Sequence, residues 1–190
     1  MSTTSSLLLL LANCISLIAF AQPTCNGTRN YTVGIKVSNI WYSGSGDDIF
    51  FTICNDNIEV TNTSNCQSQC LKWFEIQGGM QNRGDWYYFD YIDQPDIGTP
   101  GRFKLVTYEN DQLCIEKVSI DGTKWQKDES SATDFQCMEV SDSTAEYGTA
   151  CDVINITLLT STNNNKPATF VSEFYETGAE CIAAGINTTD

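Results

Sequence analysis

Eight cysteines constrain this chain more than any other feature. The sequence has nine cysteines, of which Cys14 lies in an apolar N-terminal segment. An even number of cysteines in a single-domain chain is typical of exported proteins with a disulfide framework. Zinc is the weaker alternative, because zinc sites favour CxxC or Cys/His spacing and this chain has no histidine. We expect four disulfides, and the pairing stays open among 105 arrangements. The eight residues are Cys25, Cys54, Cys66, Cys70, Cys114, Cys137, Cys151 and Cys181.

The N-terminal segment predicts export. Residues 1–21 contain the unbroken apolar run Leu7–Leu11 and end in Ala19-Phe20-Ala21, a small-x-small pattern that a signal peptidase accepts. The apolar core is short for a membrane span, although a membrane anchor is the alternative. We therefore expect a signal peptide over 1–21, a secreted, extracellular domain over 22–190, and no transmembrane segment after cleavage.

Five N-x-[ST] sequons agree with export. Each matches the acceptor pattern for N-linked glycans, and an occupied site would mark a local surface position. The candidate sites are Asn26, Asn30, Asn62, Asn155 and Asn187.

Net charge limits the partners. Lys and Arg number 10 against 24 Asp and Glu, which gives a formal charge of −14 at pH 7. Such a chain repels nucleic-acid phosphate, so no nucleic-acid partner is expected, and it attracts cations, cationic proteins or mineral surfaces. Solubility alone is the plainer interpretation, since the acidic residues are scattered rather than gathered in a block.

Apolar residues alternate with polar ones along much of the chain, which predicts β-strands. Turn residues such as glycine, asparagine and aspartate separate these runs, and short strands at that spacing are typical of a sandwich or barrel. In the run Leu113–Ile120 the alternation slips by one residue, and the segment Thr123–Gly148 is polar and poorly patterned. We predict one all-β domain, an antiparallel β-sandwich. The predicted strands are Tyr31–Val37, Ile49–Cys54, Asp85–Asp90, Arg102–Tyr108, Leu113–Ile120, Val153–Leu159 and Ala168–Val171.

The residue types exclude several kinds of catalysis. Without histidine there is no imidazole base for Ser-His-Asp or Cys-His chemistry. The chain also lacks a G-x-S-x-G elbow and a phosphate-binding glycine loop of standard spacing. A carboxylate pair of the glycosidase type stays open, but with 24 acidic residues the composition gives it no support. We expect a protein that is not an enzyme.

Aromatic and acidic loop residues are the candidate binding groups. Trp73-Phe74 and Trp86–Phe89 suit either a ligand platform or the core, with the core favoured. Trp41 and Tyr42 differ, because they end the first strand and precede a glycine-rich acidic loop, a place that suits membrane insertion or stacking on a sugar. A role in the core or as a loop staple is the favoured alternative for this pair as well. The oxygen-rich loops Ser43–Asp48 and Glu109–Asp111 suit a hard cation such as Ca²⁺, with ordinary hydrated turns as the alternative.

An ordered series of motifs runs from Tyr31 to Cys137. A strand, a glycine-rich loop and an apolar strand come first, at Tyr31–Val37, Ser43–Asp47 and Asp48–Cys54. This series resembles the PLAT/LH2 domain, an eight-stranded β-sandwich. The family tryptophan falls at Leu113, and the threonine of its GTD loop falls at Gly46. Its later motifs are similar to Trp73-Phe74-Glu75, Gly84-Asp85-Trp86, Asp96-Ile97-Gly98, Phe103-Lys104-Leu105, Tyr108–Asp111 and Leu113–Ile120.

The resemblance implies a module that binds lipid or protein, often with Ca²⁺, through loops 41–48 and 109–113. By residue match it implies calcium ligands at Gly44, Asp47, Asn110 and Asp111, and it leaves 145–190 outside as a C-terminal extension. The alternatives are a structural component of an extracellular, mineralised matrix that gathers Ca²⁺ diffusely, and a small secreted hydrolase that uses carboxylates.

Overall fold

Strands make up nearly all of the regular structure. The computed structural model describes residues 27–55, 70–107, 112–127, 133, 135–138, 151–159, 165–175 and 178–183. Within these ranges the elements are β1 (Thr28–Val37), β2 (Ile49–Cys54), β3 (Phe74–Ile76), β4 (Trp86–Pro95), β5 (Arg102–Thr107), β6 (Cys114–Ile120), β7 (Thr123–Lys127), β8 (Gln136–Cys137), β9 (Cys151–Leu158), β10 (Asn165–Tyr175) and the short helix α1 (Gly178–Ala183).

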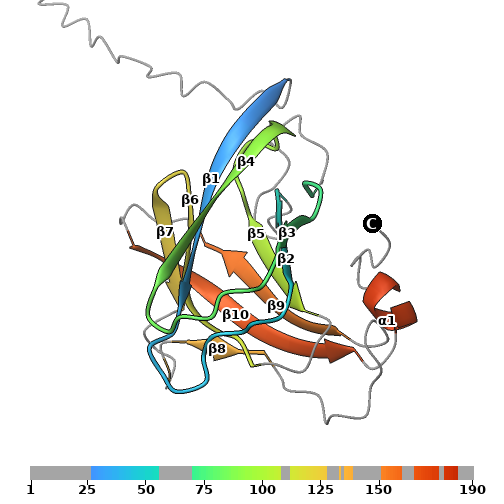
Figure 1. Cartoon of the computed structure of the whole chain (residues 1–190). Coiled ribbons are helices and arrows are strands. Elements are labelled where there is room, and N and C mark those ends of the chain that lie inside the picture. Colours follow the sequence, from blue (N-terminus) through green and yellow to red (C-terminus); the bar gives the residue numbers. More distant parts are fainter. Residues whose placement is uncertain are drawn as a thin grey trace, which may run out of the picture.

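The strands form one sheet that bends back on itself. Its order is β3-β2-β5-β9-β10-β7-β6-β1-β4, and β8 pairs with β6 off this path. All neighbours are antiparallel except β7 and β10, which run parallel. The halves of the sheet face each other across one core, so that the edge strands β3 and β4 approach on the near side of the molecule (Figure 1). The expected all-β, disulfide-bonded sandwich is therefore confirmed, with one parallel pair added.

The C-terminal part of the chain lies in the middle of this sheet. Strand β9 pairs with β5 on one side and with β10 on the other, and β10 pairs in turn with β7. The segment 145–190, which the family resemblance leaves outside, thus supplies two central strands. Strands β7 and β8 fall in the segment Thr123–Gly148, where the sequence shows no alternation. In β7 the alternation is missing because only Trp125 turns its side chain into the core.

The slip in the alternation of Leu113–Ile120 is a β-bulge. Lys36 of β1 lies opposite Lys117 of β6, while the next residue, Val37, lies opposite Ile115. Glu116 is therefore the extra residue on β6, and a bulge of this kind returns the following side chains to the correct face. Val118 and Ile120 are buried as a result.

Inward-facing side chains of both halves build the main core. On β1 they are Tyr31, Val33, Ile35 and Val37, all buried, as the alternation predicted. Burying each such side chain contributes about 1.5–3 kcal/mol. A second, smaller cluster lies on the outer face, where Val106, Cys151 and Val153 pack with Cys181 of α1. Figure 1 shows α1 beside the ends of β9 and β10, away from the loop that follows β1.

Three disulfides join neighbouring elements. They are Cys54–Cys70, Cys114–Cys137 and Cys151–Cys181, which close loops of 16, 23 and 30 residues. Each closed loop of this length restricts the unfolded chain and stabilises the fold by about 3 kcal/mol. Six of the eight predicted disulfide cysteines are thus bonded, and Cys25 and Cys66 lie outside the described residues.

Aromatic side chains join the two edges of the sheet. No backbone ladder links β3 to β4 in the described parts of the chain. Instead, the ring of Phe74 on β3 lies 5.7 Å from Phe89 and 5.4 Å from Tyr91 on β4, centroid to centroid. The ring of Phe51 on the neighbouring strand β2 stacks on that of Phe74, with 4.9 Å between their centroids. Each such aromatic pair adds about 0.5–1.5 kcal/mol beyond its burial. We call this contact between β3 and β4 the seam.

Tyr91 in the seam generates a stability prediction. It is only 4% exposed, and its hydroxyl has no hydrogen-bond partner within the described ranges. Because an unsatisfied buried hydroxyl is costly, Tyr91→Phe should raise the free energy of unfolding by about 1 kcal/mol in urea denaturation at neutral pH. Tyr31→Phe is the control, because the Tyr31 hydroxyl accepts from the Ile97 amide at 3.0 Å and donates to the Pro95 carbonyl at 3.3 Å. It should lower stability by about 1 kcal/mol, and equal losses in both variants would contradict this assignment.

Tyr91→Phe should also change the alkaline behaviour. Burial raises the pKa of Tyr91 above its ordinary value of 10.0, so the folded state favours the neutral phenol. The stability that comes from this difference in pKa between the folded and unfolded states is fully present below the unfolded pKa. It is lost as the pH rises beyond that value. Stability of the wild type therefore falls above pH 10.0, and the variant should show a shallower fall.

Candidate functional site

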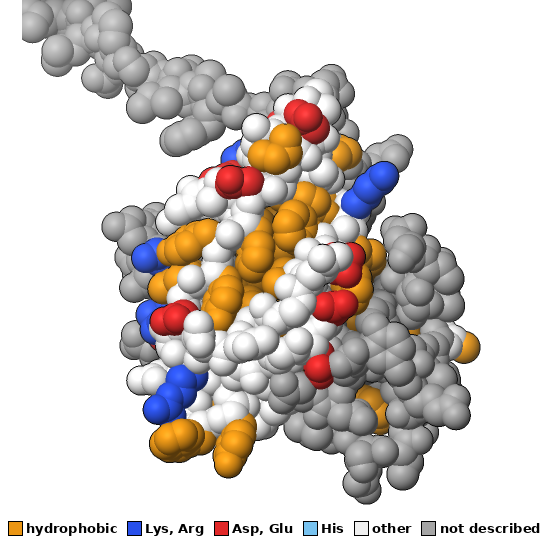
Figure 2. Space-filling model, in the orientation of Figure 1, with side chains coloured by type: hydrophobic (Ala, Val, Ile, Leu, Met, Phe, Trp, Pro, Cys, Tyr) orange, Lys and Arg blue, Asp and Glu red, His pale blue; other side chains and the backbone are white. Residues whose placement is uncertain are grey.

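The predicted binding pair lies at one end of the molecule. Trp41 is 75% exposed and Tyr42 is 83% exposed, in the loop between β1 and β2. Figure 2 shows hydrophobic side chains protruding at the lower end of the molecule, with a basic side chain beside them. Large aromatic side chains are normally buried, so this pair is an unusual feature of the surface.

Backbone hydrogen bonds fix the turn that carries this pair. The Ser38 amide donates to the Cys114 carbonyl at 2.8 Å, and the Cys114 amide donates to the Ser43 carbonyl at 2.9 Å. The Ser43 hydroxyl then donates to the Ser38 carbonyl at 2.6 Å and closes the turn across its base. Tyr42 adopts a φ of 61°, a left-handed conformation that is costly for a tyrosine and persists only where the surroundings impose it. The aromatic pair is therefore held outward by its own turn.

Arg83 from a second loop completes this surface. Its guanidinium carbon lies 4.0 Å from the centroid of the Trp41 ring, within the range of a cation–π contact. The loop that carries it is bonded to the end of β1, because the Gly84 amide donates to the carbonyls of Val37 and Ser38 at 3.1 Å each. We call Trp41, Tyr42 and Arg83 the tip.

Two glycines let the loops on either side of the tip cross at close range. The Ser45 amide donates to the Met80 carbonyl at 3.1 Å. A Cβ on Gly44 would overlap the carbonyl oxygen of Gln81, and one on Gly79 would overlap that of Ser45. Small size at these two positions is therefore a condition for the crossing.

Two of the four candidate calcium ligands, Gly44 and Asp47, lie in the described part of the chain. Gly44 serves the loop crossing, and the Asp47 amide donates to the Ser45 hydroxyl at 3.1 Å. Asn110 and Asp111 lie outside the described residues. Across the ranges that the structure describes, no three Asp, Glu or Cys side chains gather where they could hold a metal ion.

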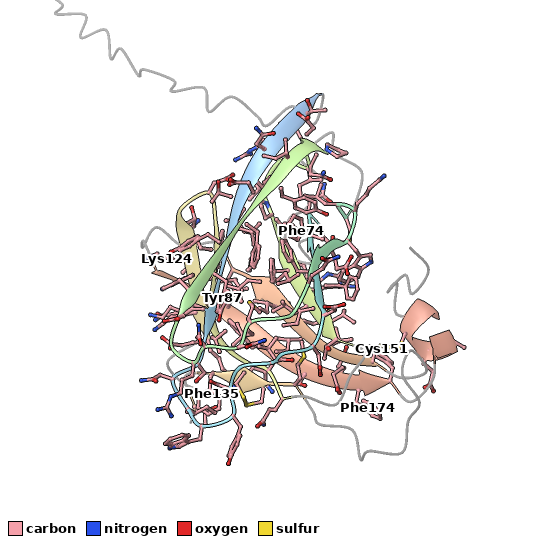
Figure 3. All side chains as sticks on the ribbon, in the orientation of Figure 1. Phe74, Tyr87, Lys124, Phe135, Cys151 and Phe174 are labelled. Carbon is pink, nitrogen blue, oxygen red and sulfur yellow. A yellow bond between two sulfur atoms is a disulfide. The ribbon has the colours of Figure 1, made fainter. Side chains whose placement is uncertain are left out.

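A second aromatic surface lies on β4. The segment Trp86–Phe89 was expected to be mainly core, and strand alternation divides it between the two faces of the sheet. Tyr87 and Phe89 pack inward, and Figure 3 shows Tyr87 and Phe74 directed into the region between β4 and β3. Trp86 and Tyr88 face outward, with their rings stacked at 5.6 Å and nearly parallel, and Tyr88 is 58% exposed.

A glycine beneath Tyr88 makes this arrangement possible. Gly34 of β1 lies directly opposite Tyr88, and a Cβ there would be 2.8 Å from a carbon of the Tyr88 ring. The ring therefore lies across the space that a side chain on β1 would fill. The ammonium of Lys124 on β7 lies 5.2 Å from the centroid of the Trp86 ring. Figure 2 shows hydrophobic side chains across the middle of this view, with basic side chains along the left edge of the molecule. We call Trp86 and Tyr88 the platform.

Two predicted glycosylation sites are described, and they differ. Asn30 on β1 is exposed, and its side-chain oxygen accepts from the Asp93 amide at 2.9 Å. Asn155 on the central strand β9 is half-buried, and its amide donates to Glu173 at 2.6 Å. A glycan at Asn155 would have to replace that hydrogen bond. Asn26, Asn62 and Asn187 lie outside the described residues.

Comparison with known proteins adds little. No protein-family model matches the chain, and no curated protein gives a significant match. Similar solved structures include a lipoxygenase variant in complex with arachidonate, at 10% identity and a TM-score of 0.39, covering 78% of this chain and 16% of that one. A second lipoxygenase variant gives 9% identity and a TM-score of 0.41, covering 80% and 17%. The chain thus spans about one sixth of their length, and TM-scores this low carry no argument about family or function.

No helix in the described ranges has the length and apolar character to cross a membrane.

Gly79 at the loop crossing and its neighbour Gly78 allow a paired prediction about stability. Gly78 and Gly79 have φ values of 68° and 65°, yet a Cβ on Gly78 meets open space while one on Gly79 meets backbone. Gly78→Ala should therefore cost only the left-handed strain, about 1–2 kcal/mol. Gly79→Ala should cost about 1–3 kcal/mol more, through overpacking. Urea denaturation measures both, and equal losses would show that the crossing is loose.

Proposed function

We propose that this protein is a secreted, non-catalytic binding module that docks on a lipid–water interface through the tip. The observation that carries the proposal is the exposure of Trp41 and Tyr42 on a turn fixed by hydrogen bonds. Tryptophan and tyrosine favour the headgroup region of a bilayer, because an apolar ring there has a polar group at its edge. Because these hydrogen bonds fix the backbone of the turn, binding requires less ordering of the loop.

Charge decides which lipids suit this surface. The chain carries −14, so strongly anionic membranes repel it as a whole, although Arg83 places one positive charge beside the rings. Zwitterionic lipid is therefore the expected target. Its phosphate accepts from the guanidinium while the rings enter the boundary with the acyl chains.

Secretion and glycosylation belong to the same proposal. The three disulfides support it, because such bonds persist in oxidising compartments and are rare in the cytosol. Membership of the PLAT/LH2 family stays a prediction from the ordered motifs. The matrix component and the carboxylate hydrolase stay alternatives from the sequence, as does a protein partner in place of lipid.

Co-sedimentation with phosphatidylcholine vesicles tests the proposal. Removing both rings in a Trp41→Ala/Tyr42→Ala variant should weaken partitioning at least about tenfold, which corresponds to about 1.4 kcal/mol of lost apolar burial. Ile92→Ala is the control, because Ile92 is an apolar side chain on β4 that is 51% exposed and lies outside the tip. Its partitioning should equal that of the wild type. Unchanged partitioning of the double variant would refute docking through the tip.

The same assay tests calcium assistance. If Gly44, Asp47, Asn110 and Asp111 hold Ca²⁺, chelation with EDTA should weaken vesicle binding, and Asp47→Ala should remove this dependence. Binding that is equal with Ca²⁺ and with EDTA would contradict the predicted role of these residues.

A further inference from the structure

Basic residues concentrate around the platform in an otherwise acidic protein. The chain as a whole carries −14. The four adjacent strands β4, β1, β6 and β7 carry five basic residues against three acidic ones, a net of +2. The basic residues are Arg29, Lys36, Lys117, Lys124 and Lys127, and the acidic ones are Asp90, Asp93 and Glu116. Asp121 in the turn after β6 pairs with Arg29, and Asp85 precedes Trp86, so this half of the sheet is close to neutral in a chain that is acidic as a whole.

The strand register places lysines in the same rows as the two platform rings. One row across the outer face runs from Tyr88 through Gly34 and Ser119 to Lys124. The next row runs from Trp86 through Lys36 and Lys117 to Gln126. Lys36 is the direct cross-strand neighbour of Trp86, and the long side chain of Lys124 brings its ammonium to 5.2 Å from the centroid of the Trp86 ring.

Ion pairing leaves ammonium groups in excess along these two rows. Lys36 lies 2.8 Å from a carboxylate oxygen of Glu116, and Lys117 lies 3.7 Å from the same oxygen. Two ammonium groups thus share one carboxylate. Lys124 adds a third ammonium, which lies over the Trp86 ring. Lys36, Lys117 and Lys124 together outnumber Glu116 by two charges, and Lys124 contacts the aromatic surface directly.

We propose that the platform binds an acidic oligosaccharide that contains uronate residues. The C–H face of a pyranose is apolar and weakly positive, so it stacks on the negative face of an exposed aromatic ring such as Tyr88. The uronate carboxylate accepts charge-assisted hydrogen bonds from Lys124 and Lys117. A neutral sugar uses the rings but leaves the ammonium groups unmatched. Nucleic acid has a charge density that the overall −14 opposes.

Calorimetric titration with a hyaluronan-type hexasaccharide, in which glucuronate alternates with N-acetylglucosamine, tests this site on the full mature chain. We expect saturable binding that weakens as salt rises. A hexamer of glucose should bind at least about tenfold more weakly, since it lacks the carboxylate. Equal affinity for the glucose hexamer, or equal affinity for a hexapeptide of glutamate, would overturn the proposal in favour of a neutral glycan or an acidic protein.

Two variants separate the rings from the charge. Tyr88→Ala should abolish binding, while Lys124→Gln, which leaves the core and both rings in place, should weaken it about tenfold. Lys72→Gln is the matched control, because Lys72 is exposed and lies outside the four strands. It removes the same charge and should leave affinity unchanged. If Lys124→Gln and Lys72→Gln bind equally, the site is not on this face. The result is independent of vesicle binding, which depends on the tip.

Discussion

Aromatic packing at the seam is the contact on which the two surfaces depend. Among the described strands, β4 has a backbone partner on one side only, β1, and its other side faces β3 through Phe74, Phe89 and Tyr91. An edge strand of ten residues is a liability unless something covers or restrains it. Inward aromatic side chains supply that restraint here. With β4 held in this way, its outward residues form a fixed surface, and the loop before it is positioned to carry Arg83.

The tip and the platform are both consequences of how β1 and β4 are placed. The tip forms where β1 ends and the loop before β4 bonds back to it, with the Gly84 amide on the carbonyls of Val37 and Ser38. The platform forms further along the same pair, where Gly34 leaves room for the ring of Tyr88. Each surface therefore depends on a glycine. Gly84 bonds the loop of Arg83 back to β1 at the tip, and Gly34 leaves room for the Tyr88 ring at the platform. Both surfaces present aromatic rings beside cations, and in an acidic chain these cations are the scarcer charge.

Much of the sheet follows from local pattern, and the sites follow only in part. Alternation predicts β1 and β5, and a dense run of β-branched and aromatic residues predicts β2. The one-residue slip in Leu113–Ile120 is visible in the sequence, and the strand register shows it to be a bulge at Glu116. Strand β7 escapes such reasoning because a single inward residue, Trp125, gives no period. In Trp86–Phe89 both faces are aromatic, so sequence cannot tell the core face from the exposed one until the register places Gly34 opposite Tyr88. The crowding at Gly44 is equally hidden, since the loop that meets it lies more than thirty residues away. For Trp41 and Tyr42 the sequence favours a core or loop-staple role, and their exposure shows that this prediction is wrong. Their position after a strand and before a glycine-rich loop is the local signal that points to exposure.

A double-mutant cycle between Phe74 and Phe89 tests the seam most directly. The two rings come from opposite edges of the sheet, and their centroids are 5.7 Å apart. If aromatic packing joins these edges, the losses of unfolding free energy in Phe74→Ala and Phe89→Ala should be non-additive, with a coupling of about 1 kcal/mol. A parallel cycle between Phe74 and Val171, which is exposed on β10, should be additive. Additivity of the Phe74 and Phe89 losses to within about 0.3 kcal/mol would contradict the account, since it would mean that the two edges do not hold each other.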